Sequence, residues 1–92
     1  MTAQDISTAI TEAINAIQQT SGNPLVPVLP ESKPIGDLPG FDSLLGLEVT
    51  LELERVVGNL PWQNVFVNDD QTKALTVGEV VSRILTLGNC KP

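Results

Sequence analysis

The chain has 92 residues, a formal net charge of −6 and a pI near 4.2, with 41% hydrophobic and only 3% aromatic residues. This length predicts a single domain over residues 1–92, with one core and little room for a deep catalytic cavity. The negative charge disfavours nucleic acid and anionic membranes as partners and favours basic proteins. The composition is therefore typical of a carrier, an adaptor or a binding module rather than of an enzyme.

Several kinds of residue or segment are missing from the sequence. It contains no histidine, the usual general base near neutral pH and the commonest zinc ligand. Cys90 is the single cysteine, so no internal disulfide can form, and we expect this thiol to have no role. No stretch supplies the ~20 apolar residues of a membrane span, and the first ten residues lack the features of a signal peptide. We therefore expect a cytoplasmic monomer without a metal site.

The first amphipathic pattern predicts a helix that begins after Thr2 and ends at residues 21–24. Thr2 and Asp5 have the spacing of an N-terminal cap, and the sequence Ser-Gly-Asn-Pro supplies the stop. Apolar residues recur at steps of three and four, at Ile6, Ala9, Ile10, Ala13, Ile14 and Ile17. Residues 23–40 hold five of the seven prolines and predict a long, stiff loop. Its apolar residues indicate that this loop packs along the core.

A second helix is predicted over residues 42–57, with Gly58 and Asn59 as its C-terminal cap. The connection after it has room for a short helical turn, and its Trp62 and Phe66 are expected to fill the core. The last helix begins with a capping box formed by Thr76 and Glu79. Its buried stripe is expected to be Val77, Val80, Val81, Ile84 and Leu85. The fold class is therefore all-α, a small bundle of three to four helices with a long loop between the first and second helices.

The second helix carries apolar side chains on two faces when its residues are placed at steps of about 100°. One face is assigned to the core and contains Leu45, Val49, Leu53, Val56 and Val57. The roughly opposite face contains Leu44, Leu47 and Leu51, which we call the leucine strip, flanked by Glu48, Glu54 and Arg55. Since a core needs only one face, the leucine strip is either covered by the proline-rich loop or exposed to partners.

Ser43 lies at the start of this helix, in the sequence PGFDSLLGLEV. By residue type alone, Asp42 or Ser43 caps the helix. A second hypothesis makes Ser43 a nucleophile, but without histidine its base must be a lysine or a carboxylate, and no GxSxG motif is present. A third hypothesis is an unmodified interaction module whose leucine strip docks a partner helix.

The segment FDSLLGLEVTLELE resembles the Asp-Ser-Leu motif and the following helix of the acyl carrier protein family. The likeness extends loosely over the order of helices, to a last helix that opens LTVGEVVSRIL. This resemblance implies that Ser43 receives a phosphopantetheine arm, and that Asp42 and Leu44 are its motif neighbours. It also implies that Glu48, Leu51 and Glu54 are recognised by partner enzymes. Leu47, on the same strip, is expected to join in this recognition, and all three leucines of the strip are expected to lie near the path of the arm.

The resemblance implies a carrier without catalytic activity of its own. Its partners would be a phosphopantetheinyl transferase and acyl-transferring or synthase enzymes with basic docking surfaces. The cargo would be acyl intermediates of fatty-acid, polyketide or related lipid biosynthesis, or aminoacyl and peptidyl groups of nonribosomal type. Leu45, Arg55 and the long connection after Val57 depart from the usual pattern, which favours a specialised carrier over a standard fatty-acid carrier. A phosphodiester on Ser43 would benefit from the positive end of the helix dipole.

Overall fold

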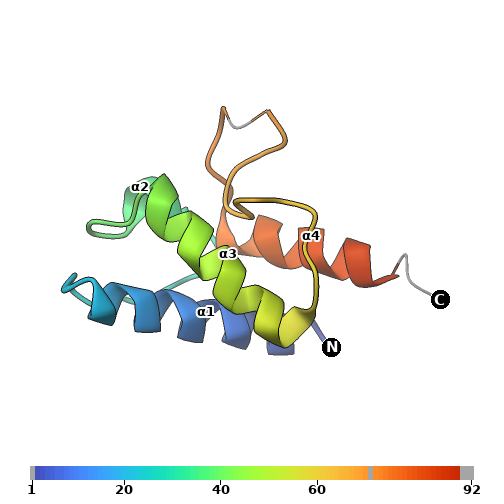
Figure 1. Ribbon diagram of the computed structural model, residues 1–92, viewed down its shortest axis with the longest axis horizontal. Coiled ribbons are helices and arrows are strands. Elements are labelled where there is room, and N and C mark those ends of the chain that lie inside the picture. Colours follow the sequence, from blue (N-terminus) through green and yellow to red (C-terminus); the bar gives the residue numbers. More distant parts are fainter. Residues whose placement is uncertain (1, 71, 90–92) are drawn as a thin grey trace.

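The computed structural model describes residues 2–70 and 72–89, so the expectation for Cys90 lies outside the described residues. Four helices follow one another: α1 (Ala3–Thr20), α2 (Pro34–Asp37), α3 (Ser43–Val57) and α4 (Val77–Asn89). Helix α1 packs against both α3 and α4, and α3 runs obliquely across α1 (Figure 1). The one β feature of the described residues is an isolated antiparallel bridge between Val67 and Ala74. The all-α prediction is therefore confirmed.

The predicted ends of the helices are confirmed by their caps. Thr2 and Asp5 form a capping box at α1, in which each backbone N–H donates to the other residue's side chain over 3.1 Å. The same reciprocal pair joins Thr76 and Glu79 before α4. Gly58 has a φ of 91° and ends α3, a conformation that favours glycine. No helix in the described ranges is both long and apolar enough to cross a bilayer.

The short helical turn lies in the proline-rich loop and not, as the sequence suggested, in the connection after α3. Pro34 occupies the first turn of α2, where its missing N–H costs no hydrogen bond. The Asp37 carboxylate accepts the N–H of Lys33 over 2.8 Å and closes this turn. The loop packs on the core through Leu38 and, in part, through Val26, Val28 and Ile35, whereas Leu25 and Leu29 are exposed.

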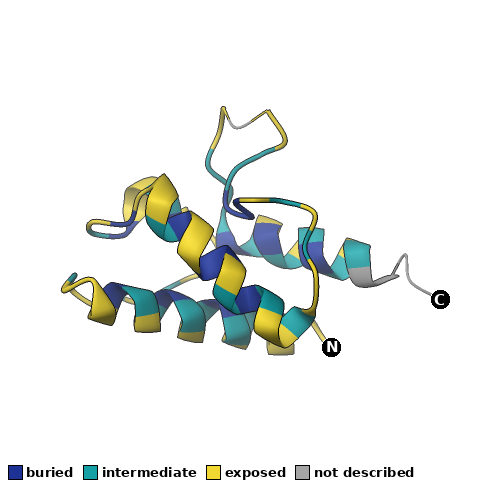
Figure 2. Ribbon diagram, in the orientation of Figure 1, coloured by how far each residue is buried: buried dark blue, intermediate teal, exposed yellow. Residues whose placement is uncertain are grey.

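One core lies between α1, α3, α4 and the connection after α3. Figure 2 shows buried residues recurring along the three long helices. Phe66 is fully buried and meets Phe41 edge to face, with 5.8 Å between the ring centroids. Trp62 is only partly buried and packs at the margin of the core. The expectation of a core filler is therefore confirmed fully for Phe66 and in part for Trp62.

The predicted core face of α3 is correct except at Val56. Val49 and Leu53 are completely buried, and Leu45 and Val57 pack against the core from its margin. Val56 is 58% exposed, because it borders a surface groove of about 480 Å³ that the side chains of α1 and α3 leave open between the two helices. The residues that α1 contributes to this lining include Ala9, Ala13 and Ala16.

Candidate functional site around Ser43

Asp42 and Ser43 divide two tasks at the start of α3. Asp42 is the N-cap: its carboxylate accepts the N–H of Leu45 over 3.1 Å, and its carbonyl accepts the N–H of Gly46 over 3.0 Å. Ser43 is the first residue of the helix and is exposed. Its hydroxyl forms no hydrogen bond with any described residue. The helix therefore begins correctly without the Ser43 side chain, which leaves that hydroxyl accessible for chemistry.

The first turn of α3 has the geometry that an anion on Ser43 needs. The first amides of any α-helix lack partners within the helix, and here Asp42 serves the amides of Leu45 and Gly46. The amides of Ser43 and Leu44 find no acceptor in the described part of the chain. Together with the positive end of the helix dipole, these N–H groups fit a phosphate oxygen close to the Ser43 hydroxyl.

Of the two alternatives that the sequence left open, a covered or an exposed leucine strip, the structure shows the exposed one. Leu44 is 63% exposed, Leu47 37% and Leu51 64%, so the proline-rich loop does not cover them. Together they form an apolar surface that starts beside Ser43 and follows the outer side of α3. An exposed apolar strip on an otherwise polar helix face is a feature of surfaces that bind partners.

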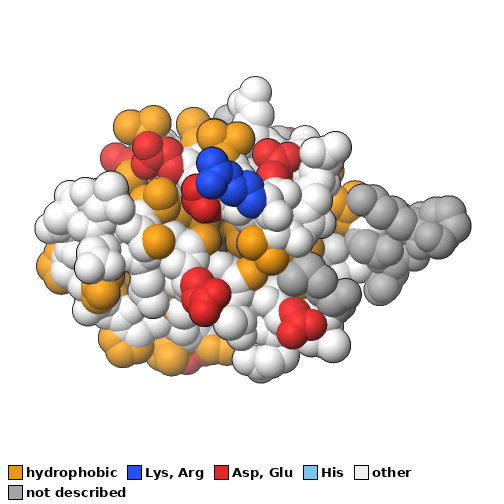
Figure 3. Space-filling model, turned by 60° about the horizontal axis from the view of Figure 1, so that its bottom comes forward, with side chains coloured by type: hydrophobic (Ala, Val, Ile, Leu, Met, Phe, Trp, Pro, Cys, Tyr) orange, Lys and Arg blue, Asp and Glu red, His pale blue; other side chains and the backbone are white. Residues whose placement is uncertain are grey.

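The two acidic residues assigned to partner recognition differ in their surroundings. Glu48 is exposed and makes no hydrogen bond or ion pair within residues 2–70 and 72–89. The carboxylate of Glu54 accepts the N–H of Leu60 over 2.9 Å and is partly buried. Arg55 pairs with Glu52 over 3.6 Å. Figure 3 shows a face of the molecule on which acidic side chains lie among apolar ones, whereas basic side chains occupy one area.

Gln18 anchors the chain segment that leads into α3. It is buried, its Nε2 donates to the Pro39 carbonyl over 2.8 Å, and its Oε1 accepts from the Asn23 side chain over 2.9 Å. Gly40 has a φ of 67°, and a Cβ there would lie 2.5 Å from the Asn23 side chain. Sequence reasoning missed Gln18, although it continues the four-residue spacing of Ile6, Ile10 and Ile14 and so had a detectable signal.

A polar seam joins the inner side of α3 to residues 64–66. Asn64 donates from Nδ2 to the Ser43 carbonyl over 3.0 Å and accepts the N–H of Phe66 at Oδ1 over 3.0 Å. Two turns further along α3, the Thr50 hydroxyl donates to the Gly46 carbonyl over 2.7 Å and accepts the N–H of Val65 over 3.0 Å. Sequence reasoning missed this seam, because its bonds join residues 15 and 21 positions apart.

A hollow of about 320 Å³ opens beside Ser43 and is bordered by the seam. Its lining consists of Ser43, Leu47, Gln63, Asn64 and Val67. Two of these residues belong to α3 and three to the connection after it, so the hollow depends on how that connection is held. Its walls are apolar at Leu47 and Val67 and carry amide groups at Gln63 and Asn64. Such a lining combines apolar contacts with amide groups that can donate and accept hydrogen bonds.

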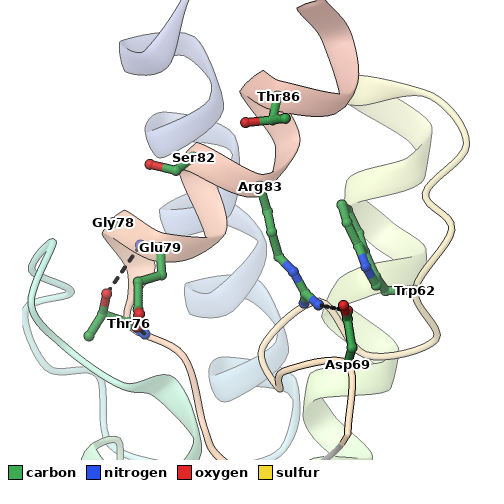
Figure 4. Close-up of a pocket in the computed structure, with 8 residues that line it drawn as sticks. All are labelled: Trp62, Asp69, Thr76, Gly78, Glu79, Ser82, Arg83 and Thr86. Atoms are coloured by element: carbon green, nitrogen blue, oxygen red, sulfur yellow. Dashed lines mark hydrogen bonds and ion pairs between the residues drawn. The ribbon is translucent and has the colours of Figure 1, made fainter. Parts of the chain in front are cut away.

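A larger hollow of about 660 Å³ lies between α4 and the connection, and it shares no lining residue with the one beside Ser43 (Figure 4). Arg83 crosses it, with its guanidinium carbon 4.3 Å from the centroid of the Trp62 ring. The same guanidinium donates to the carbonyls of Val65 and Val67 over 3.1 and 2.7 Å and to the Asp69 carboxylate over 2.7 Å. These contacts occupy the guanidinium, so Arg83 fastens the connection to α4. Asp69 is an exposed residue of the connection that forms an ion pair with Arg83.

Comparisons with protein-family models, with curated proteins and with solved structures found no match to this chain. The described residues contain no group of three His, Cys, Asp or Glu side chains able to hold a metal ion. The geometry around Ser43 is therefore the observation from which a function can be inferred. It brings Asp42, Ser43 and Leu44 together with Leu47, and it sets Glu54 apart at the other end of α3.

Proposed function

We propose that this protein is a carrier in which Ser43 receives a phosphopantetheine arm. The arm would hold acyl intermediates for partner enzymes of fatty-acid, polyketide or related lipid biosynthesis. The observation that supports the proposal most is the division of tasks at the start of α3. Asp42 caps the helix through the Leu45 amide, so the exposed Ser43 hydroxyl has no structural duty. Phosphopantetheine, when bound, supplies a terminal thiol on which an acyl group is carried as a thioester.

The residues around Ser43 would then have distinct tasks. The amides of Ser43 and Leu44 would stabilise the phosphodiester, because they point out of a helix N-terminus. Asp42 would keep the first turn of the helix in place during modification, since its carboxylate is already bonded to the Leu45 amide. Neither task requires the core to open.

The leucine strip and Glu48 would form the surface that partner enzymes contact. Leu44 and Leu51 are the more exposed members of the strip and would enter apolar pockets of the partner. Glu48 would face basic residues of the phosphopantetheinyl transferase or of a synthase, and such rim charges act mainly on the association rate. Glu54 would contribute less, because its carboxylate is bonded to the Leu60 amide.

Two alternatives use the same surface differently. A carrier of aminoacyl or peptidyl groups would use Ser43 in the same way and differ only in its cargo. An unmodified interaction module would use the leucine strip alone to dock a partner helix and would leave Ser43 unchanged. The exposed, unbonded hydroxyl favours a carrier over the unmodified module, because docking through leucines does not need it.

The test is modification of the protein by a broad-specificity phosphopantetheinyl transferase with coenzyme A, followed by intact mass measurement. The wild-type protein should gain the mass of one arm, and Ser43→Ala should gain nothing. Ser82→Ala provides a matched control, because Ser82 is an exposed serine on α4, and this variant should be modified as wild type. A wild-type protein that gains no mass, or a Ser43→Ala protein that still does, would exclude the assignment.

Ser43→Ala should also keep its fold. Losing a helix cap typically costs ~1 kcal/mol, but here the cap is Asp42, which the substitution leaves intact. The far-ultraviolet circular dichroism spectrum should therefore equal that of wild type. A loss of helical signal would mean that Ser43 is a structural residue after all.

A further inference from the structure

Among the described residues, Asn64 is the one side chain that connects the backbone of Ser43 to the connection after α3 by a hydrogen bond. It is 8% exposed, and both ends of its amide are bonded, to the Ser43 carbonyl and to the Phe66 amide. The approach is close because position 46 is glycine: a Cβ there would lie 2.7 Å from the Asn64 amide atoms. Asn64 also lines the hollow beside Ser43. The backbone that carries the Ser43 hydroxyl is thus held from the side.

We propose that Asn64 is a positioning residue for the reaction at Ser43, an inference that rests on the proposed function. By holding the Ser43 carbonyl, Asn64 fixes the first turn of α3 relative to the hollow and to the leucine strip. A transferase that docks on the strip then meets the hydroxyl at a set distance and angle. Misplacing a reacting group by about 1 Å can reduce a rate about a hundredfold, although binding is unchanged.

The seam provides its own control for a merely structural effect. Thr50 forms the second half of the seam, is buried like Asn64, and also satisfies a buried amide of the connection, that of Val65. It lies two turns beyond Ser43 on α3 and has no contact with the hollow. Thr50→Val keeps the shape of the side chain and removes its hydrogen bonds, so it should loosen the connection without releasing the Ser43 carbonyl.

Three variants separate the two roles. Asn64→Asp keeps an acceptor for the Phe66 amide and replaces the donor to Ser43 by an oxygen. Gly46→Ala pushes the intact Asn64 amide away without adding charge, and alanine is a better helix former than glycine. Thr50→Val is the control. Each is tested with the phosphopantetheinyl transferase and coenzyme A for kcat and KM, after circular dichroism and a urea melt have established that it is folded under the assay conditions.

For Asn64→Asp and Gly46→Ala we expect kcat to fall at least about tenfold while KM stays within about twofold, because the docking surface is unchanged. Thr50→Val should keep the wild-type kcat. Without any enzyme, amide hydrogen exchange in residues 45–48 should be faster in the first two variants than in Thr50→Val.

The outcomes distinguish this inference from the function on which it rests. If the wild-type protein gains no arm, the proposed function itself fails. If the wild-type protein is modified and Gly46→Ala retains its kcat and its slow exchange, positioning by Asn64 is refuted. It is equally refuted if Thr50→Val loses as much kcat as Asn64→Asp, because the seam would then act only through stability. Should Asn64→Asp fail to fold, Gly46→Ala still decides the question.

Discussion

Truncating Leu53 and Leu51 to alanine tests the two faces of α3 separately. Leu53 is 0% exposed and Leu51 is 64% exposed, although they are two residues apart on one helix. Removing buried methyl and methylene groups from Leu53 should cost ~2 to 5 kcal/mol, the range for leucine-to-alanine changes in filled cores. A chain of 92 residues has a free energy of unfolding of about 5 to 14 kcal/mol. Leu53→Ala should therefore remove a large part of the stability, and Leu51→Ala no more than ~0.5 kcal/mol.

Urea denaturation followed by circular dichroism measures both variants against wild type. The midpoint should fall clearly for Leu53→Ala and barely for Leu51→Ala, with an unchanged slope that shows that the unfolded states are comparable. The same proteins are then offered to the transferase, where Leu51→Ala should weaken modification despite its stability. Equal destabilisation by the two variants would refute the assignment of Leu51 to an exposed docking surface and would place it in the core.

The remaining predictions concern charges. Glu48→Lys should slow modification far more at low than at high ionic strength, because a rim charge acts through steering, and equal slowing at both salts would remove Glu48 from the interface. The Thr76 backbone amide lowers the pKa of Glu79 below its ordinary 4.5, so this carboxylate stabilises the fold above about pH 4.5 and ceases to do so as the pH falls through the folded-state pKa. In urea melts, the free energy of unfolding of Glu79→Gln should therefore fall less than that of wild type between about pH 5 and 3. An equal fall in the two proteins would contradict the capping role of Glu79. Arg83→Lys should lower the free energy of unfolding by about 1.5 to 3 kcal/mol, because an ammonium group cannot reproduce the forked contacts of the guanidinium. The same substitution should alter the fluorescence of Trp62, the single tryptophan. Unchanged fluorescence and stability would mean that Arg83 does not fasten the connection to α4.

The sequence was sufficient wherever a structural feature depends on neighbours within about four residues. The capping boxes at Thr2 and Thr76 are of this kind, since each joins residues three apart. The angular spacing of a helix placed Leu53 on the core face and Leu51 on the opposite face, but it left open whether the proline-rich loop covers Leu51. The prediction for Val56 was wrong for a reason that is not local: its angle is right for the core, but the angle does not report that α1 and α3 leave a groove open beside it.

The polar residues that hold the site could not be placed in the same way. A buried polar side chain needs a partner, and the backbone carbonyls to which Gln18 and Asn64 donate lie 21 positions away in the chain. Composition gives no sign of such pairs, because glutamine and asparagine are mostly exposed. The sequence also did not indicate that Gly40 and Gly46 allow asparagine side chains to approach the backbone closely. A glycine can occur in a loop or helix for many other reasons.

Because of these contacts between distant residues, the two ends of α3 differ in how many side-chain hydrogen bonds hold their backbone in place. The end that carries Ser43 is held from both sides, by Gln18 through the Pro39 carbonyl before the helix and by Asn64 through the Ser43 carbonyl after it. Within the described part of the chain, the far end has one side-chain hydrogen bond to another segment, in which the Glu54 carboxylate accepts the N–H of Leu60. A surface helix that only docks a partner needs no such support at one end, because its binding energy comes from exposed side chains. A helix whose first residue is to be modified needs a hydroxyl that is held in a fixed position. In α3 the additional hydrogen bonds lie at the end that carries Ser43, where the proposed modification would occur.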